Sequence, residues 1–85
     1  MNFGEALYAL KEGKKIERSG WNGKGMFLYY VPAAEYVAVT EIAKQTFGST
    51  VPYGAYIAMK TAQNNVVPWL ASQTDVLSED WQIID

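Results

Sequence analysis

The first apolar residues of the chain recur with the spacing of one helix face. Residues 2–12 predict a short helix because four apolar side chains stand at positions i, i+3, i+4 and i+7: Phe3, Ala6, Leu7 and Leu10. Asn2 can cap the start of this helix, with Glu5 reaching back to it, and Gly13 suits a left-handed end. The segment KKIER, residues 14–18, then predicts a short strand that leads into a glycine-rich loop.

The next apolar run, GMFLYYVP at residues 25–32, predicts a strand with two apolar faces. One face carries Met26, Leu28 and Tyr30, and the other carries Phe27, Tyr29 and Val31. A strand with one wet face would alternate with polar residues, so we expect this strand to be covered on both sides. The helix at residues 2–12 is one candidate cover, and a second subunit is the other.

The middle of the chain has weaker patterns. YVAV at residues 36–39 predicts a strand, and residues 40–47 predict a short helix capped by Thr40. Glycine, serine and proline then punctuate the chain up to Tyr53, which predicts a loop.

The second half predicts a hairpin, a helical turn and a final strand. Residues 55–62 and 65–69 flank Gln63, Asn64 and Asn65, and asparagine tolerates the left-handed conformation of tight turns. Pro68 favours an edge strand or a strand end. Residues 72–80 predict one or two helical turns capped by Ser72, and WQIID, 81–85, predicts the last strand. The sum is one α+β domain over residues 1–85, with an N-terminal helix packed on a mainly antiparallel sheet.

Composition narrows the chemistry of this domain. Its 85 residues include no cysteine and no histidine, which excludes disulfides, thiolate metal sites and the usual general base near neutral pH. We therefore expect no cofactor, no metal and no catalysis. A domain of this size hides only about 60 to 65% of its unfolded surface. Because 49% of its residues are apolar, we expect it to gain stability by forming a homo-oligomer.

Charge is unevenly distributed along the chain. The net charge of −2 argues against a general nucleic-acid binder or a binder of anionic membranes. Residues 11–24 hold five basic and two acidic residues, +3, whereas residues 75–85 hold four acidic residues and no basic one, −4. These segments could be solvated faces that attract each other, or the first could be a cationic site for an anionic ligand. No signal peptide and no apolar run of about 20 residues is present, so we expect a soluble, cytoplasmic protein.

Two segments carry the residue types that bind a nucleotide. In RSGWNGKG, residues 18–25, Trp21 offers a surface on which a purine could stack, and Asn22 offers a polar contact for a ribose. Arg18, Lys24 and the backbone amides of the glycines could meet a pyrophosphate. Phe27 follows on the next strand as a further candidate contact. The segment PWLASQTD, 68–75, offers a second set of candidates: Trp69, Ser72, Gln73, Thr74 and Asp75.

Each of these residues also has a purely structural interpretation. We expect Trp81, in DWQII, to be a core residue, and Trp69 could pack in the core as well. Trp21 is balanced between the two roles because glycines surround it. Capping of a short helix would alone account for Ser72 and Asp75, although a cap can also contact a ligand.

Three stretches of the chain together resemble the Thoeris anti-defense 2-like family of small phage and prophage proteins. They are NFGEALYALKEGKKIERSGWNGKGMFLYYVP, YIAMKTA and VPWLASQTDVLSEDWQIID, about two thirds of the chain. The pairing of GWNGKGMFL with PWLASQTD is the most specific part. Residue by residue, the match covers Trp21, Asn22 and the segment 69–75, whereas Arg18, Lys24 and Phe27 are candidates on physical grounds alone.

The resemblance implies a non-catalytic sponge that sequesters a messenger nucleotide. Proteins of this family form homo-oligomers, including tetramers, and capture glycocyclic ADP-ribose made by the TIR-domain enzyme of the bacterial host. With the messenger sequestered, the Thoeris effector stays inactive. Some relatives also hold cyclic oligonucleotides such as cyclic dinucleotides at a separate site. An inhibitor that binds a host defense enzyme directly and an ADP-ribose hydrolase are the competing hypotheses.

Overall fold

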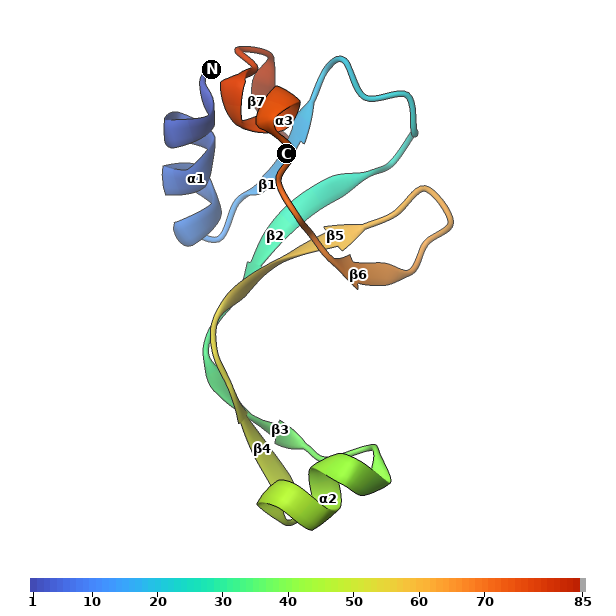
Figure 1. Ribbon diagram of the computed structural model, residues 1–85. Helices are drawn as coiled ribbons and strands as arrows, with labels where there is room; N and C mark the ends of the chain where they lie inside the picture. The colour runs from blue at the N-terminus through green and yellow to red at the C-terminus, as the bar shows by residue number, and fades with distance from the viewer. Residues whose placement is uncertain (85) are drawn as a thin grey trace.

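The computed structural model describes residues 1–84, so Asp85, the last residue of the predicted final strand, lies outside the described residues. Three helices and two antiparallel sheets make up the described chain, an α+β architecture as predicted (Figure 1). The elements follow in the order α1 Phe3–Lys11, β1 Lys15–Arg18, β2 Phe27–Val31, β3 Ala34–Val37, α2 Glu41–Phe47, β4 Thr50–Tyr53, β5 Tyr56–Lys60, β6 Val66–Pro68, α3 Gln73–Leu77 and β7 Trp81–Ile84.

The helices begin at the caps that the sequence predicts. At α1, the Asn2 side chain accepts from the Glu5 amide and the Glu5 carboxylate accepts from the Asn2 amide, each at 2.9 Å. Gly13 follows this helix with a φ of 89°, a conformation that favours glycine. Thr40 caps α2 and Ser72 caps α3, each by accepting a hydrogen bond from the backbone amide three residues later. Among residues 1–84, no helix has the length and apolar character needed to cross a membrane.

The five-stranded sheet and α1 form the body, residues 1–31 and 56–84. Its strand order is β6-β5-β2-β1-β7, and α1 packs on β1, β2 and β7. The core between them is made of Ala6, Ala9, Leu10, Ile16, Leu28 and Trp81. Asn64 turns the β5–β6 hairpin with a φ of 70°, and Pro68 ends the edge strand β6, both as predicted. Trp81 is only 2% exposed, which confirms its core role.

The prediction that β2 is covered on both sides is met on one side within the described chain. Leu28 pairs with Ile16 of β1 beneath α1, and both are fully buried. Because side chains alternate along a strand, Phe27, Tyr29 and Val31 point to the opposite face. They are only partly buried there, since α1 contacts β2 from the other side. This second face of the sheet is therefore open in one chain.

Residues 32–55 form an arm that projects from the body. Figure 1 shows β2 continuing into β3, and β4 returning into β5, as one long bent ribbon with α2 at its far end. The radius of gyration is 14.9 Å, against about 12 Å for a compact chain of this length. Two predictions here are wrong: the strand lies at Ala34–Val37 rather than 36–39, and the predicted loop before Tyr53 contains β4. β4 pairs with β3, so tertiary pairing overrides its proline and flanking glycines.

Candidate functional site

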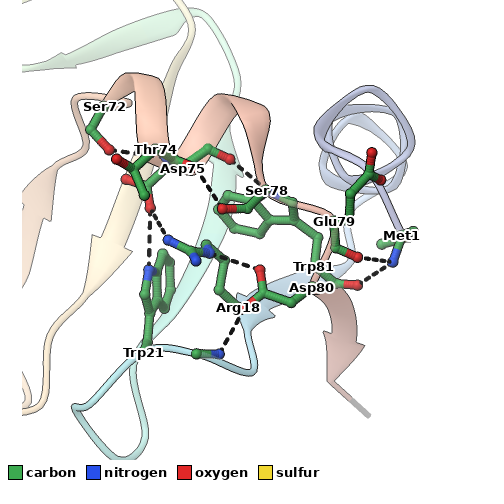
Figure 2. Close-up of polar contacts among 11 residues, drawn as sticks. Met1, Arg18, Trp21, Ser72, Thr74, Asp75, Ser78, Glu79, Asp80 and Trp81 are labelled. Carbon is green, nitrogen blue, oxygen red and sulfur yellow. Dashed lines mark hydrogen bonds and ion pairs between the residues drawn. The ribbon is translucent and has the colours of Figure 1, made fainter.

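The glycine loop after β1 is tied to the C-terminal segment by one arginine and two aspartates. Arg18 Nε donates to Asp80 Oδ1 and Arg18 Nη1 donates to Asp75 Oδ1, both at 2.8 Å (Figure 2). The Arg18 side chain is 17% exposed, so these charge-assisted bonds form in a partly desolvated position. The cationic and acidic segments of the sequence therefore meet here through Arg18, Asp75 and Asp80.

Asp80 also fixes the backbone of the glycine loop. Ser19 donates its amide to the Asp80 carbonyl at 3.1 Å, and Gly20 donates its amide to Asp80 Oδ2 at 2.9 Å. A Cβ atom on Gly20 would lie 2.8 Å from that same carboxylate oxygen, closer than a real Cβ approaches. Glycine at position 20 is therefore what allows the carboxylate to approach the loop.

An aromatic cluster lies beside these ion pairs. The rings of Trp21 and Trp69 each meet Trp81 edge to face, with centroids 5.4 Å and 6.0 Å away. Phe3 of α1 packs on both Trp69 and Trp81. Trp81 Nε1 donates to the Asp75 carbonyl at 2.9 Å, and Trp21 Nε1 points at Asp75 Oδ1 from 3.4 Å. Trp21 and Trp69 remain only partly buried, so each ring presents part of its surface outside the core.

The charges of this cluster are held in their ionised forms. Burial alone would raise the pKa of Asp75, but hydrogen bonds from Arg18, Ser72 and Trp21 outweigh it and hold the pKa below its usual value. The hydrogen bond from Arg18 lowers the pKa of Asp80, and the Gly20 amide lowers it further. The two aspartates raise the pKa of Arg18 in return. With one cation between two anions, the cluster carries a net charge of −1 at neutral pH.

Several predicted contact residues do come together at this cluster. Trp21 lies against α3, whose cap Ser72 accepts the Asp75 amide at 3.0 Å. Gln73 and Thr74 are exposed on α3, and Asn22 and Lys24 are exposed on the loop. Trp69 joins through its contact with Trp81.

Two expectations about the anion-binding groups need correction. Arg18 is not a free cation, because Asp75 and Asp80 already accept two of its donors. The amides of Ser19, Gly20 and Trp21 are also engaged within the chain. Lys24 and the amides of residues 22–25 form none of these hydrogen bonds.

Phe27 is not part of this cluster. Arg18 shares a sheet face with Ile16, under α1, whereas Phe27 points to the opposite, open face. There its ring lies 5.1 Å from Lys15 Nζ and 6.0 Å from Lys60 Nζ, within the range of cation–π attraction. Lys60 also donates to the Gly25 carbonyl at 3.0 Å, which connects the loop to β5.

Sequence reasoning missed the residue that organises the site, Asp80. The Asp80 carboxylate turns toward Arg18 (Figure 2). No local motif marks Asp80 as a partner of the loop. The only available signal was the charge contrast between residues 11–24 and 75–85.

By fold and site, the chain is a small α+β protein in which a glycine loop and a short third helix meet at an aromatic cluster. The family described as Thoeris anti-defense 2-like domain matches residues 1–84. The chain is also 43% identical over 84 residues to the protein named Thoeris anti-defense 2 of Bacillus phage SP01, covering 99% of this chain and 94% of that protein. The chain therefore belongs to the Thoeris anti-defense 2-like family.

Proposed function

We propose that this chain opposes Thoeris defense by binding glycocyclic ADP-ribose and sequestering it unchanged in the cytoplasm of the infected bacterium. Membership of the Thoeris anti-defense 2-like family supports the anti-Thoeris part of this proposal. The observation that carries the binding part is the partly exposed Trp21, held in one orientation beside α3.

Trp21 is prepared to stack on the adenine of the messenger. Its ring is supported by Trp81, and its indole nitrogen is directed at Asp75. A side chain that is ordered before binding loses less entropy when the ligand arrives. A stack of an aromatic ring on a base is worth about 1–3 kcal/mol.

In this proposal, groups other than Arg18 contact the phosphates of the messenger. Lys24 and the amides of residues 22–25 supply charge and donors on the exposed part of the loop. Asn22 and the exposed Gln73 and Thr74 offer hydrogen-bond partners for ribose hydroxyls. This division keeps the anionic ligand away from the net negative charge of the Arg18, Asp75 and Asp80 cluster.

Binding without turnover is supported by the state of the two aspartates. A general acid near neutral pH needs a raised pKa, whereas the pKa values of Asp75 and Asp80 are both lowered. Arg18 also donates to Oδ1 of each aspartate, and the Gly20 amide donates to Oδ2 of Asp80. The sequence supplies no histidine or cysteine in their place.

We further propose that the active form is a homo-oligomer, a tetramer by analogy with the family. The open sheet face that carries Phe27, Tyr29 and Val31 supports this, since it would be covered by another chain. The arm supports it too, because Val39 and Ile42 are 83% and 77% exposed.

These same surfaces favour direct inhibition of a host enzyme as the second candidate function. By analogy with the family, we propose cyclic oligonucleotides, including cyclic dinucleotides, as a second class of ligand that binds at a separate site.

Recovery of the messenger after denaturation tests the proposal. The protein is mixed with glycocyclic ADP-ribose, freed from unbound ligand by gel filtration, and then denatured by heat. A sponge carries the messenger through the column and releases it intact. Release of fragments would instead indicate a hydrolase, and a protein fraction without messenger would favour the protein-binding inhibitor. Cyclic dinucleotides run in parallel measure the breadth of binding.

A further inference from the structure

The arm presents one complete strand edge and one interrupted edge. In its two-stranded sheet, Val37 is opposite Thr50 and Glu35 is opposite Pro52. The Ala38 amide donates to the Ser49 carbonyl at 2.9 Å, so position 38 is a hydrogen-bonded pair. Since such pairs alternate along an antiparallel ladder, the backbone groups of Glu35 and Val37 point outward from β3, and those of Pro52 and Thr50 point outward from β4.

Proline interrupts one of these edges. Pro52 has no amide hydrogen, so the outer edge of β4 lacks a donor in its middle. The outer edge of β3 keeps both donors and both acceptors of Glu35 and Val37. All four residues of β3 are exposed, and Val37 is 74% exposed. A further strand can therefore form a complete set of hydrogen bonds with the arm only along the outer edge of β3.

The arm is also too small to form a stable unit by itself. Only Ala38 and Val51 are buried in it, and α2 has no buried residue. A two-stranded hairpin is marginal in water, whereas three or more strands with a covered face are stable. Two arms joined edge to edge would form a four-stranded sheet. Because Ala38 and Val51 share the face that α2 covers, both helices would lie on the same side of that sheet.

We infer that β3 pairs antiparallel with β3 of a second copy of this chain, with Glu35 opposite Val37 of the partner copy and Tyr36 at the two-fold axis. This inference rests on the homo-oligomer part of the proposed function and names its contact. In this register every outward N–H and C=O of Glu35 and Val37 is bonded once, and each hydrogen bond occurs twice by symmetry, as an isologous interface requires. It also separates the two Glu35 carboxylates, and it sets the Tyr36 rings together beside the existing Tyr36–Tyr53 contact.

Charge substitutions at position 37 test this register. Val37→Glu would place a glutamate opposite each Glu35, and two like-charge pairs should weaken the dimer about 2- to 30-fold. Val37→Lys should leave the dimer as tight or tighten it, because the lysine would face Glu35. The double variant Glu35→Lys with Val37→Glu should restore association by reversing both charges.

Thr50→Glu is the matched control, because Thr50 is directly across from Val37 on the same face but on the other edge. Sedimentation over a concentration series measures association, and circular dichroism checks that each variant folds. Equal weakening by Val37→Glu and Thr50→Glu, or a double variant that stays dissociated, would overturn the inference. An oligomer indifferent to all four variants would overturn the β3 contact and leave the homo-oligomer standing. A parent chain that is monomeric throughout would remove both.

Discussion

The body and the arm use the same kinds of residue with opposite results. In the body, strands distant in sequence pair side by side, and Leu10 of α1 packs with Ile16, Leu28 and Trp81 away from water. In the arm, strands are joined only to each other, and large apolar residues such as Val39 and Ile42 stay exposed. Burial therefore depends on how many elements the topology brings together, and not on apolar content alone.

The two regions differ in their polar contacts as well. The body fixes its loop with the bridges of Arg18 to Asp75 and Asp80, which join positions 57 and 62 residues apart. Side-chain hydrogen bonds within the arm are local, such as Tyr36 to the Pro32 carbonyl and Thr46 to the Ile42 carbonyl. We therefore expect the body to be stable in one chain and the arm to gain most from a partner.

The largest expected difference is between core truncation in the body and truncation on the arm. Trp81→Ala should cost about 3–5 kcal/mol of unfolding free energy, because it empties the centre of the core. Ile42→Ala on α2 should change that free energy by less than about 0.5 kcal/mol, since its side chain is exposed. Urea unfolding measures the free energy of unfolding of both variants, at a protein concentration too low for the chains to associate. A large loss from Ile42→Ala would mean that the arm packs on the body.

A smaller effect should come from the cation that ties the loop to the C-terminal segment. Arg18→Met keeps an unbranched apolar stem but removes the two charge-assisted donors of Asp75 and Asp80, which should lower the free energy of unfolding by less than Trp81→Ala does. Lys24→Met on the same loop should be close to neutral for stability, because Lys24 is exposed. Equal stabilities for the two variants would show that the bridges contribute nothing measurable.

The smallest expected effect is the pH dependence of the body. The pKa values of Asp75 and Asp80 are lowered in the folded chain, so their contribution is complete above the unfolded value of about 3.9. It should be lost as the pH falls below that value through the folded pKa values. Thermal melts between pH 7 and pH 2 should therefore show an acid loss that is reduced in Arg18→Met. If Arg18→Met loses as much thermal stability in acid as the parent does, other carboxylates must cause that loss.

The body shows what local patterns can and cannot predict. The α1 helix and its Asn2 cap follow from apolar spacing and from a glutamate three residues later, both local properties. The contact of Arg18 with Asp80 has no local signal, because it is created when β1 and β7 become neighbours in the sheet. The packing of Trp21 on Trp81 has no local signal either, because the loop position of Trp21 does not predict a contact with the core.

The arm was harder to predict because its strands break local preferences. Pro52 lies inside β4, and Gly48 and Gly54 flank this strand, so the sequence favoured a loop. Pro52 is tolerated because its position faces the outer edge, where no intrachain donor is needed. Such a position becomes visible only once the pairing of β3 with β4 is known.

Calorimetric titration of glycocyclic ADP-ribose into the parent chain and into Trp21→Ala tests the central claim most directly. We expect the parent to bind and Trp21→Ala to bind about 10- to 100-fold more weakly while still folded, because the stack on the base is lost. Phe47→Ala, which truncates an exposed aromatic side chain on the arm, is the matched control and should keep the affinity of the parent. Equal affinity of Trp21→Ala and the parent, or no binding by the parent, would contradict the account.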